Sequence, residues 1–387
     1  MLYSDVRFRQ TETAPHRHSG KIDLTLLLLT LLLLGIGVLM VLSASFASAY
    51  YDLQGETGGN AAWYFLHQSV FAVAGVGAML LCARVPMRLY HRLSPLLMAA
   101  SLLALVLVLF VGVRVNGARR WISLGFTTFQ PSEIVKVAVI LCFPRLICRF
   151  GDRMRSFRYG VAPFAAILGV IALLLVLEPH FSATVILLML GAVLLFLGGV
   201  SLGWYIGGFT LLAVGGTAAY LQVPYVAARV NAFLDPFSDL TGDGWQIVQS
   251  LYAIGSGGLL GLGLGQSRQK YLYLPEEHND FIFSVVCEEL GFLGATAILC
   301  LFAALILRGF WIALRARDRY SFLVGSGIST MLALQTILNV AVCTNLVPCT
   351  GISLPFFSYG GTALALQLFE MGIVLSVSRQ IPAPKGG

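Results

Sequence analysis

The sequence contains few charged residues. Asp, Glu, Lys and Arg make up 11% of the 387 residues, whereas 58% are hydrophobic. A soluble globular domain carries about 25% charged residues. The composition therefore excludes an ordinary soluble domain and indicates a protein that crosses a membrane several times. The formal net charge of +7 then concerns orientation in the membrane, and it does not indicate a nucleic-acid partner.

Several catalytic and metal-binding signatures are also missing. The seven cysteines form no CxxC pair and have no His-rich partner segment, so neither a disulfide framework nor a zinc site is predicted. The sequence has no GxSxG elbow and no Walker A loop. A GxGxG run at 261–265 follows no predicted strand, so it does not indicate a nucleotide site.

Long apolar runs dominate the chain instead. A spanning helix needs about 20 mostly apolar residues. Ten such segments predict an all-α polytopic membrane protein, and they lie near 22–46, 63–83, 94–113, 131–148, 160–178, 181–200, 203–222, 281–307, 321–344 and 360–379. The first is followed by Ala47-Ser48-Ala49, but it is too long for the core of a signal peptide, so we expect it to be retained.

The positions of the cations predict the orientation. With both termini in the cytoplasm, 18 of the 25 Lys and Arg residues fall on the inner side, as membrane proteins prefer. These inner cations are Arg7, Arg9, Arg17, Lys21, Arg84, Arg88, Arg92, Arg145, Arg149, Arg153, Arg155, Arg158, Arg308, Arg315, Arg317, Arg319, Arg379 and Lys385.

The predicted organisation is one membrane domain over 22–380 between cytoplasmic tails at 1–21 and 381–387. A large extracytoplasmic loop, about 222–280, joins the seventh and eighth helices. Within it, Ile247, Leu251 and Ile254 recur at helical spacing, which predicts a short amphipathic helix at the outer surface. A packed loop without this helix is the alternative.

Two outer arginines stand where the topology usually keeps cations scarce. Arg119 and Arg120 lie in "RVNGARRWISLG", between the third and fourth helices. A planar guanidinium matches the oxygens of a phosphate, so these residues are candidates to hold a lipid-linked diphosphate. The alternative is contact with anionic headgroups or loop carboxylates. Trp121 suits either a membrane interface or stacking on a sugar ring.

The fourth helix carries an ionisable pair. Glu133 and Lys136 in "QPSEIVK" are three residues apart, which places them on one face of a helix. Ionisable residues within a span face the bundle interior or a water-filled cavity. The pair is therefore either a structural ion pair or part of a polar cavity open to the outside, and the two roles are compatible.

Ionisable residues also crowd the start of the eighth helix. In "YLYLPEEHNDFIFSVVCEELG", Asn279 and Asp280 immediately precede an apolar run. Either residue suits a helix N-cap, and Asp280 also suits a catalytic base. One cap does not need four ionisable groups, which favours a functional site at this mouth. Glu288 and Glu289 lie about two turns inside the helix, where we expect at least one to be a buried structural group, and Glu370 is expected to be structural too.

The segment "NLVPCTGISLPFFSYGGTALALQ" is rich in Pro and Gly and has almost no charge. Such a segment can form a re-entrant outer loop where it is buried in protein or lines a cavity. Ser358 and Tyr359 offer hydroxyl groups to a ligand. Gly360 and Gly361 allow close backbone approach.

Three of these motifs together resemble the SEDS family, which includes FtsW, RodA and SpoVE. The motifs are "VNGARRWISLGFTTFQPSEIVK", the stretch from "FLDPFSDLTGDGWQ" to "NDFIFSVVCEELG", and "VPCTGISLPFFSYGG", and the resemblance covers roughly residues 20–380. The text of the loop motif is closer to FtsW or SpoVE than to RodA. The resemblance implies a peptidoglycan glycosyltransferase of the bacterial cytoplasmic membrane. Such an enzyme polymerises lipid II at the outer face for cell division, cell shape or the spore wall.

The resemblance also implies site residues and partners. The family's essential loop aspartate matches Asp280, and its first motif matches Arg120 and Trp121. The helix-four pair matches Glu133 and Lys136, and "SYGG" matches Ser358 to Gly361. The implied partner is a class B penicillin-binding protein, a transpeptidase, among other divisome or elongasome membrane proteins. His180 in "EPHFSAT" departs from the family's "QPDLGT", so this position carries no essential carboxylate here.

These observations yield a mechanistic hypothesis. Asp280 is the general base, and Arg120 holds the donor diphosphate with Arg119 and Lys136 as further candidates. A divalent cation, Mg²⁺ or Mn²⁺, between Asp280 and the diphosphate stays open, because no ligand cluster demands it. Two other classes remain: a flippase that carries lipid II across the membrane, and a non-catalytic scaffold that activates the penicillin-binding protein.

Overall fold

The computed structural model describes residues 20–51, 55, 57–115, 118–123, 125, 127–238, 242 and 244–381. The tail cations Arg7, Arg9, Arg17 and Lys385 lie outside the described residues. All ten apolar segments form helices: α1 (Leu24–Tyr51), α2 (Trp63–Cys82), α3 (Met87–Val111), α4 (Pro131–Phe150), α5 (Ala162–Leu177), α6 (Phe181–Leu197), α7 (Gly203–Gln222), α10 (Ile282–Leu314), α11 (Arg319–Cys343) and α12 (Gly361–Ser378).

Eight of the described helices are long and apolar enough to cross a membrane. α5 reaches this length together with the helical turn Phe157–Val161 that precedes it. The two that differ are α6, which has only 17 residues, and α4, which carries four charged side chains. The number of spans and the placement of the long loop therefore stay predictions. α1 runs unbroken through Ala47-Ser48-Ala49. α3 begins seven residues before the predicted segment. Its first turns hold the polar residues Arg88 and Arg92, so the apolar pattern did not reveal them.

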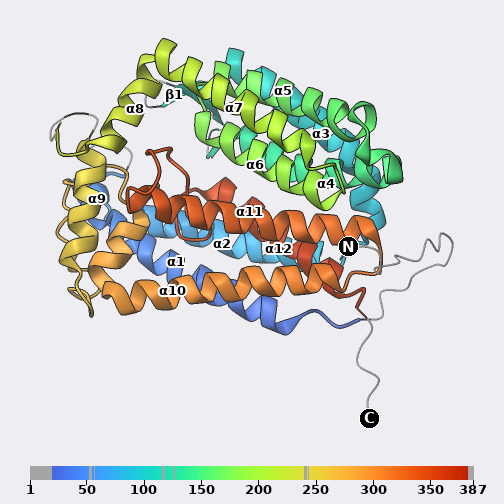
Figure 1. Ribbon diagram of the computed structural model, residues 1–387. Helices are drawn as coiled ribbons and strands as arrows, with labels where there is room; N and C mark the ends of the chain where they lie inside the picture. Colours follow the sequence, from blue (N-terminus) through green and yellow to red (C-terminus); the bar gives the residue numbers. More distant parts are fainter. Residues whose placement is uncertain are drawn as a thin grey trace.

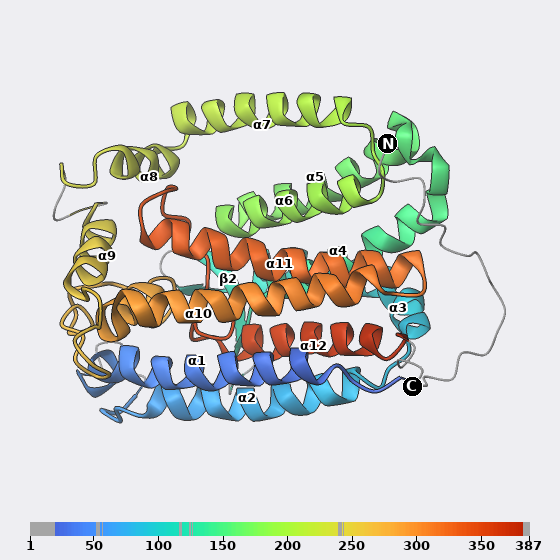
Figure 2. The ribbon, with the colours of Figure 1, turned by 60° about the horizontal axis from the view of Figure 1, so that its bottom comes forward.

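The helices pack in an order that differs from their order along the chain. α12 lies against α2, and α10 lies against both α11 and α1, as Figures 1 and 2 show. α11 and α12 are largely buried and form the centre of the bundle. α7 has no buried residue, and Figure 2 shows it apart from the other long helices, next to α8 (Pro224–Leu234).

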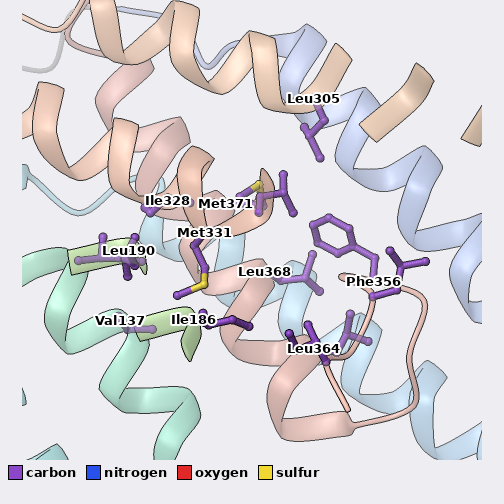
Figure 3. Close-up of a cluster of buried hydrophobic side chains, with 14 of the residues drawn as sticks. Val137, Ile186, Leu190, Leu305, Ile328, Met331, Phe356, Leu364, Leu368 and Met371 are labelled. Atoms are coloured by element: carbon purple, nitrogen blue, oxygen red, sulfur yellow. The ribbon is translucent and has the colours of Figure 1, made fainter. Parts of the chain in front are cut away.

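An apolar cluster joins α4, α6, α10, α11, α12 and the 345–361 segment (Figure 3). Its labelled members are Val137, Ile186, Leu190, Leu305, Ile328, Met331, Phe356, Leu364, Leu368 and Met371. Small residues let these helices approach closely. A Cβ at Gly372 would lie 2.5 Å from the carbonyl oxygen of Met79, so the backbones of α2 and α12 approach each other closely. Close packing of this kind holds helices together in a membrane, where lipid competes for apolar contact.

One end of the bundle carries irregular structure that an all-α prediction missed. The connection from α3 to α4 forms a three-stranded antiparallel sheet of β1 (Val113–Val115), β2 (Ala118–Ser123) and β3 (Thr128–Phe129). The long loop contains α8 and α9 (Trp245–Ser256), and the predicted helix with Ile247 on its buried face is α9. α9 packs against α10 and α11, and in Figures 1 and 2 it lies across the end of α10 instead of running along it.

α10 is broken where the sequence predicted continuous helix. Gly291 has φ +67°, and its backbone closely approaches Gly261 in the loop after α9. The Leu262 N–H donates to the Glu288 carbonyl, and the Phe292 N–H donates to the Gly258 carbonyl, each within 3.0 Å. The break is stable because these loop groups hydrogen-bond the backbone on both sides of it.

Candidate active site

Asp280 lies at the end of the long loop, two residues before α10. The N-cap of α10 is Phe281, and no side chain caps it. Asn279 Nδ2 donates instead to Glu276 Oε2 at 2.6 Å. The prediction that Asn279 or Asp280 caps this helix is therefore wrong. The helix begins at Ile282, so both residues lie before its N-cap position.

A side chain from α11 holds the backbone at Asp280. Asn339 Nδ2 donates to the Asp280 carbonyl at 2.8 Å and to the Ile352 carbonyl at 2.7 Å. Asn339 is fully buried, so these two bonds satisfy its amide in the interior. One buried amide therefore fixes the loop that carries Asp280 beside the 345–361 segment.

The carboxyl group of Asp280 is partly buried in a mixed electrostatic environment. Burial raises its pKa to about 6, and the nearby Glu276 carboxylate adds to the rise. Arg229, Arg120 and His278 oppose it. Within the described part of the chain, desolvation outweighs these three groups, so the pKa of Asp280 stays above its ordinary value.

A glycine makes room for this carboxylate. Gly351 has φ +69°, and a Cβ at this position would lie 2.9 Å from Asp280 Oδ2. The neighbouring Thr350 carbonyl accepts a hydrogen bond from Ser182 Oγ at the start of α6. The 345–361 segment and α6 therefore form one wall beside the carboxylate.

The two outer arginines have different surroundings. Arg120 on β2 donates from Nε to the Glu178 carbonyl at 3.3 Å and from Nη2 to the Pro179 carbonyl. Arg119 is exposed, and its Nη1 lies 3.4 Å from the Leu109 carbonyl at the end of α3. Val113 and Arg114 of β1 pair with Trp121 and Arg119, so β2 has an extra residue, a bulge, at Arg120. The hydrogen bonds place Arg120 at the α5–α6 connection and Arg119 at the end of α3.

Arg120 is the cation shared by the site. It acts electrostatically on Asp280, on Glu178 and on His180. Trp121 is partly buried on β2 in register with Val113. The structure thus brings Arg120 toward Asp280, whereas Arg119 lies at the end of α3.

The predicted pair on α4 is formed. Lys136 Nζ lies 2.7 Å from Glu133 Oε2, and both side chains are largely buried. Lys136 also acts electrostatically on His180, at the start of α6, and on Glu370 of α12. The pair therefore lies in a polar region between α4, α6 and α12, one turn below the sheet that carries Arg120.

The "SYGG" segment contacts the site through its backbone. Ser358 Oγ donates to the Asn279 carbonyl at 2.7 Å and accepts from the Leu354 N–H at 2.7 Å. Its hydroxyl therefore helps to hold the fold at Asn279, and its predicted contact with a ligand stays a prediction. The Tyr359 N–H donates to the His278 carbonyl at 2.8 Å. The segment holds residues 278–279 in place.

Its glycines and tyrosine pack on α2. The Gly360 N–H donates to Gln68 Oε1 at 3.2 Å. Gly361 abuts the ring of Phe71 so closely that a Cβ would clash, so close approach is confirmed there. The Tyr359 ring makes an edge contact with Tyr64, with centroids 4.8 Å apart. These contacts place an aromatic cluster beside the Asp280 loop.

Sequence reasoning missed Glu178 as a member of the site. The side chain is 1% exposed, and neither carboxyl oxygen has a hydrogen-bond partner among the described residues. Burial raises its pKa to about 8, although Arg120 opposes the rise. His180, two residues on, has a pKa lowered to about 3, mainly by burial and then by Arg120 and Lys136. The only sequence signal was the departure of "EPHFSAT" from the family pattern.

Glu288 and Glu289 are both buried and bonded within the fold, whereas at least one of them was expected to be structural. Glu289 Oε1 lies 2.9 Å from Lys270 Nζ, and the Ser43 hydroxyl donates to the same carboxylate. Glu288 accepts from the Ser267 hydroxyl at 2.5 Å and from the Arg268 N–H at 3.0 Å. Both carboxylates attach the loop after α9 to α10.

The residues at the site offer little to a metal ion. Among the described residues, no three His, Cys, Asp or Glu side chains gather as a metal-binding group. Asp280 with one neighbouring glutamate falls short of the six or more oxygen ligands of Mg²⁺ or Ca²⁺. The residues present do not build a protein cage, and a cation held chiefly by substrate oxygens stays a prediction.

The chain is similar to curated proteins over nearly its whole length. It is 41% identical to stage V sporulation protein E of Bacillus subtilis (strain 168) over 359 residues, covering 92% of this chain and 97% of that protein. It is 38% identical to a "Probable peptidoglycan glycosyltransferase FtsW" of Trichlorobacter lovleyi, covering 92% and 93%. These relatives carry the names SpoVE and FtsW that the loop motif favoured.

Solved structures share the fold. One is a chain of a peptidoglycan synthase complex, from work on the structural coordination of polymerization and crosslinking. The superposition has a TM-score of 0.76 at 31% identity, and it covers 92% of this chain and 98% of that one. Thermus thermophilus RodA, the rod shape determining protein, gives a TM-score of 0.67 at 29% identity, covering 92% and 97%. Residues 24–382 match the family of cell cycle proteins that comprises FtsW, RodA and SpoVE, and the chain belongs to this family.

Proposed function

We propose that the chain is a peptidoglycan glycosyltransferase that polymerises lipid II at the outer face of the cytoplasmic membrane. The names of its relatives and its family support the enzyme class. The observation that carries the proposal is Asp280, a partly buried carboxyl with a pKa near 6 in the field of Arg120. A group of this pKa is largely ionised at neutral pH and still accepts a proton effectively.

In the proposed reaction, Asp280 takes the proton from a sugar hydroxyl of the acceptor. The resulting oxygen attacks the anomeric carbon of the donor sugar, and a glycosidic C–O bond forms. The bond from that carbon to the diphosphate breaks, and its electron pair leaves on the diphosphate. The configuration inverts, so an α-linked diphosphate yields a β-1,4 bond. The proton on Asp280 then passes to water.

Arg120 is the proposed contact for the leaving diphosphate. Two backbone carbonyls of the α5–α6 connection orient its guanidinium, which has five N–H donors in total. A cation held in place before the reaction stabilises the developing charge without reorganising. Lys136 is the weaker candidate, because Glu133 already neutralises it, and Arg119 is not retained, because it is exposed and its guanidinium lies at the end of α3.

The proposed partner is a class B penicillin-binding protein. One structural relative is a chain of a peptidoglycan synthase complex that coordinates polymerization and crosslinking, which supports a transpeptidase partner for this chain. The proposed orientation puts both termini in the cytoplasm and the Asp280 site outside. It is supported by the basic connections Gly151–Arg155 and Phe157–Val161, which lie at the opposite end of α4 and α5 from β2.

The test is glycan polymerisation from lipid II by the purified complex with its partner. Asp280→Asn keeps the size of the side chain and removes the base, so we expect the rate to fall by about 10²–10⁴-fold. Asp235→Asn is the matched control, because Asp235 is an exposed carboxylate in the same loop, and it should polymerise like the wild type. An undiminished rate in Asp280→Asn contradicts the base assignment.

The same assay separates the enzyme from its two rivals. Lipid II supplied only on the outer face of a vesicle is polymerised by an enzyme, whereas a flippase moves lipid II between leaflets and makes no glycan. A scaffold predicts that Asp280→Asn still supports full glycan synthesis in the complex. Either of those outcomes overturns the proposed function.

A further inference from the structure

A basic cavity lies at the other end of the bundle from Asp280. It has a volume of about 510 Å³, and it opens where α1 begins and where α2 and α12 end. Its lining is Gly20, Lys21, Ile22, Arg84 and Arg379. Three of these five residues are cations and none is acidic. The volume is within the range of small-molecule sites, about 300–1,000 Å³.

Hydrogen bonds between separate segments build the walls. The Gly20 N–H donates to the Arg379 carbonyl at 3.1 Å. Arg379 Nη1 donates to the Ala83 carbonyl at 3.2 Å. The segment before α1, the end of α2 and the end of α12 are thus tied together, and the cavity lies among them. Arg379 keeps most of its five N–H donors, and Lys21 and Arg84 are exposed.

The cavity has an excess of positive charge. The acid nearest to it in sequence, Asp23, is committed to Arg308, whose Nε and Nη2 lie 3.1 and 2.6 Å from the carboxylate oxygens. In the part of the chain that the structure describes, Lys21, Arg84 and Arg379 enter no salt bridge. The Ala83 carbonyl accepts from one donor of Arg379. It does not balance the charges of Lys21 and Arg84.

The depth of these cations matches that of lipid headgroups. Lys21 lies three residues before α1, Arg84 two residues after α2, and Arg379 directly after α12. The headgroup region on each side of a bilayer is roughly 5–8 Å thick, so residues this close to the ends of apolar helices lie within it. Beside the cavity, Leu24 and Leu28 of α1 and Leu81 of α2 are more than half exposed.

We propose that this cavity binds the headgroup of an anionic phospholipid. The phosphate lies among Lys21, Arg84 and Arg379, and the acyl chains lie along the exposed leucines of α1 and α2. Basic pockets between helices on the cytoplasmic side bind such headgroups, and each cation contributes attraction at the surface. This site is independent of the glycosyltransferase chemistry and lies outside it.

The test measures binding of phosphatidylglycerol to the full chain in detergent, by native mass spectrometry. The variant replaces all three cations, Lys21→Gln, Arg84→Gln and Arg379→Gln. At about fivefold per cation, we expect affinity to fall on the order of a hundredfold. The control removes three exposed cations elsewhere on the basic end, Arg149→Gln, Arg155→Gln and Arg317→Gln, and should lose less than fivefold. Equal losses in the two triple variants overturn the proposal.

Two further arms fix the ligand without depending on the variants. Phosphatidylcholine should bind the wild type much more weakly than phosphatidylglycerol, and millimolar inorganic phosphate should not displace the lipid. A photoreactive phosphatidylglycerol should label peptides from the start of α1 and the ends of α2 and α12. Displacement by inorganic phosphate makes this a free-anion site, and labelling confined to other helices places the lipid elsewhere. Either outcome contradicts the proposal.

Discussion

The carboxylates on the two sides of the α10 start differ sharply in their surroundings. Glu288 and Glu289 are saturated with donors: hydroxyl groups, backbone amides and the Lys270 ammonium group. Asp280, in the described residues, has its backbone held by Asn339 while its carboxyl receives no hydrogen bond. A saturated carboxylate stabilises the fold and has little capacity left for a substrate proton. An unsaturated one costs stability and keeps that capacity.

The largest expected effect comes from breaking the saturated side. Glu289→Gln leaves the Lys270 ammonium group, which is 2% exposed, without its counter-ion. Loss of one partner of a buried ion pair typically costs about 3–5 kcal/mol. We expect a clear drop in the melting temperature of the purified protein. Asp280→Asn should not lower it, because that change removes a carboxyl whose burial is unfavourable. Comparable drops in melting temperature for Glu289→Gln and Asp280→Asn would contradict the distinction between saturated and unsaturated carboxylates.

The pH dependence of catalysis is the second test. The proposed base, Asp280, works only when deprotonated, and burial raises its pKa to about 6. We therefore expect kcat/KM to fall about tenfold per pH unit below pH 6 and to level off above it. Glu276→Gln removes one cause of the raised pKa and should move this limb to lower pH. A limb near pH 4 in the wild type, unchanged in Glu276→Gln, would argue against the assignment.

A smaller effect should follow from filling the space beside Asp280. Gly351→Ala places a methyl group 2.9 Å from Oδ2 at a φ of +69°. We expect about a tenfold loss of polymerisation and about 1–3 kcal/mol of destabilisation. Gly199→Ala is a matched control, because Gly199 has φ +85° with open space around it. It should share the stability loss and keep full activity. Equal activity in the two variants would mean that the space between Gly351 and Asp280 does not affect polymerisation.

The smallest effect concerns Glu178, a carboxyl that lacks donors but lies behind Arg120. Its pKa is about 8 in the folded chain against an ordinary 4.5. Between these values only the folded chain keeps the proton, so this group stabilises the fold less and less as pH rises from 4.5 to 8. Glu178→Gln should melt close to wild type at pH 5 and above it at pH 8. A gap that does not widen with pH would show that Glu178 is ionised in the fold.

Local patterns predicted the features that depend on neighbours along the chain. The ten apolar runs became helices, the spacing of Glu133 and Lys136 produced an ion pair, and Ile247 marked the buried face of α9. The missed features depend on distant segments. Asn339 holds a carbonyl 59 residues away, and Gln68 bonds a segment 290 residues away. The break at Gly291 forms because a loop of glycines lies against it, which no helical periodicity reveals.

The three β-strands were missed for a related reason. They have only 3, 6 and 2 residues, which is too short for an alternating pattern to be recognised in the sequence. Their effect on the site is large, because the bulge at Arg120 re-aims a side chain, as bulges near functional sites do. The family resemblance matched Arg120, but the contacts of Arg120 and Arg119 supply the physical reason.

The two hydrogen bonds that Asn339 donates have a mechanical consequence. Its amide joins the carbonyls of Asp280 and Ile352, so Asp280 and the segment that holds Gly351 are linked through a single side chain on α11. A shift of α11 therefore moves the two carbonyls together, and the spacing between Asp280 and the Gly351 segment stays constant.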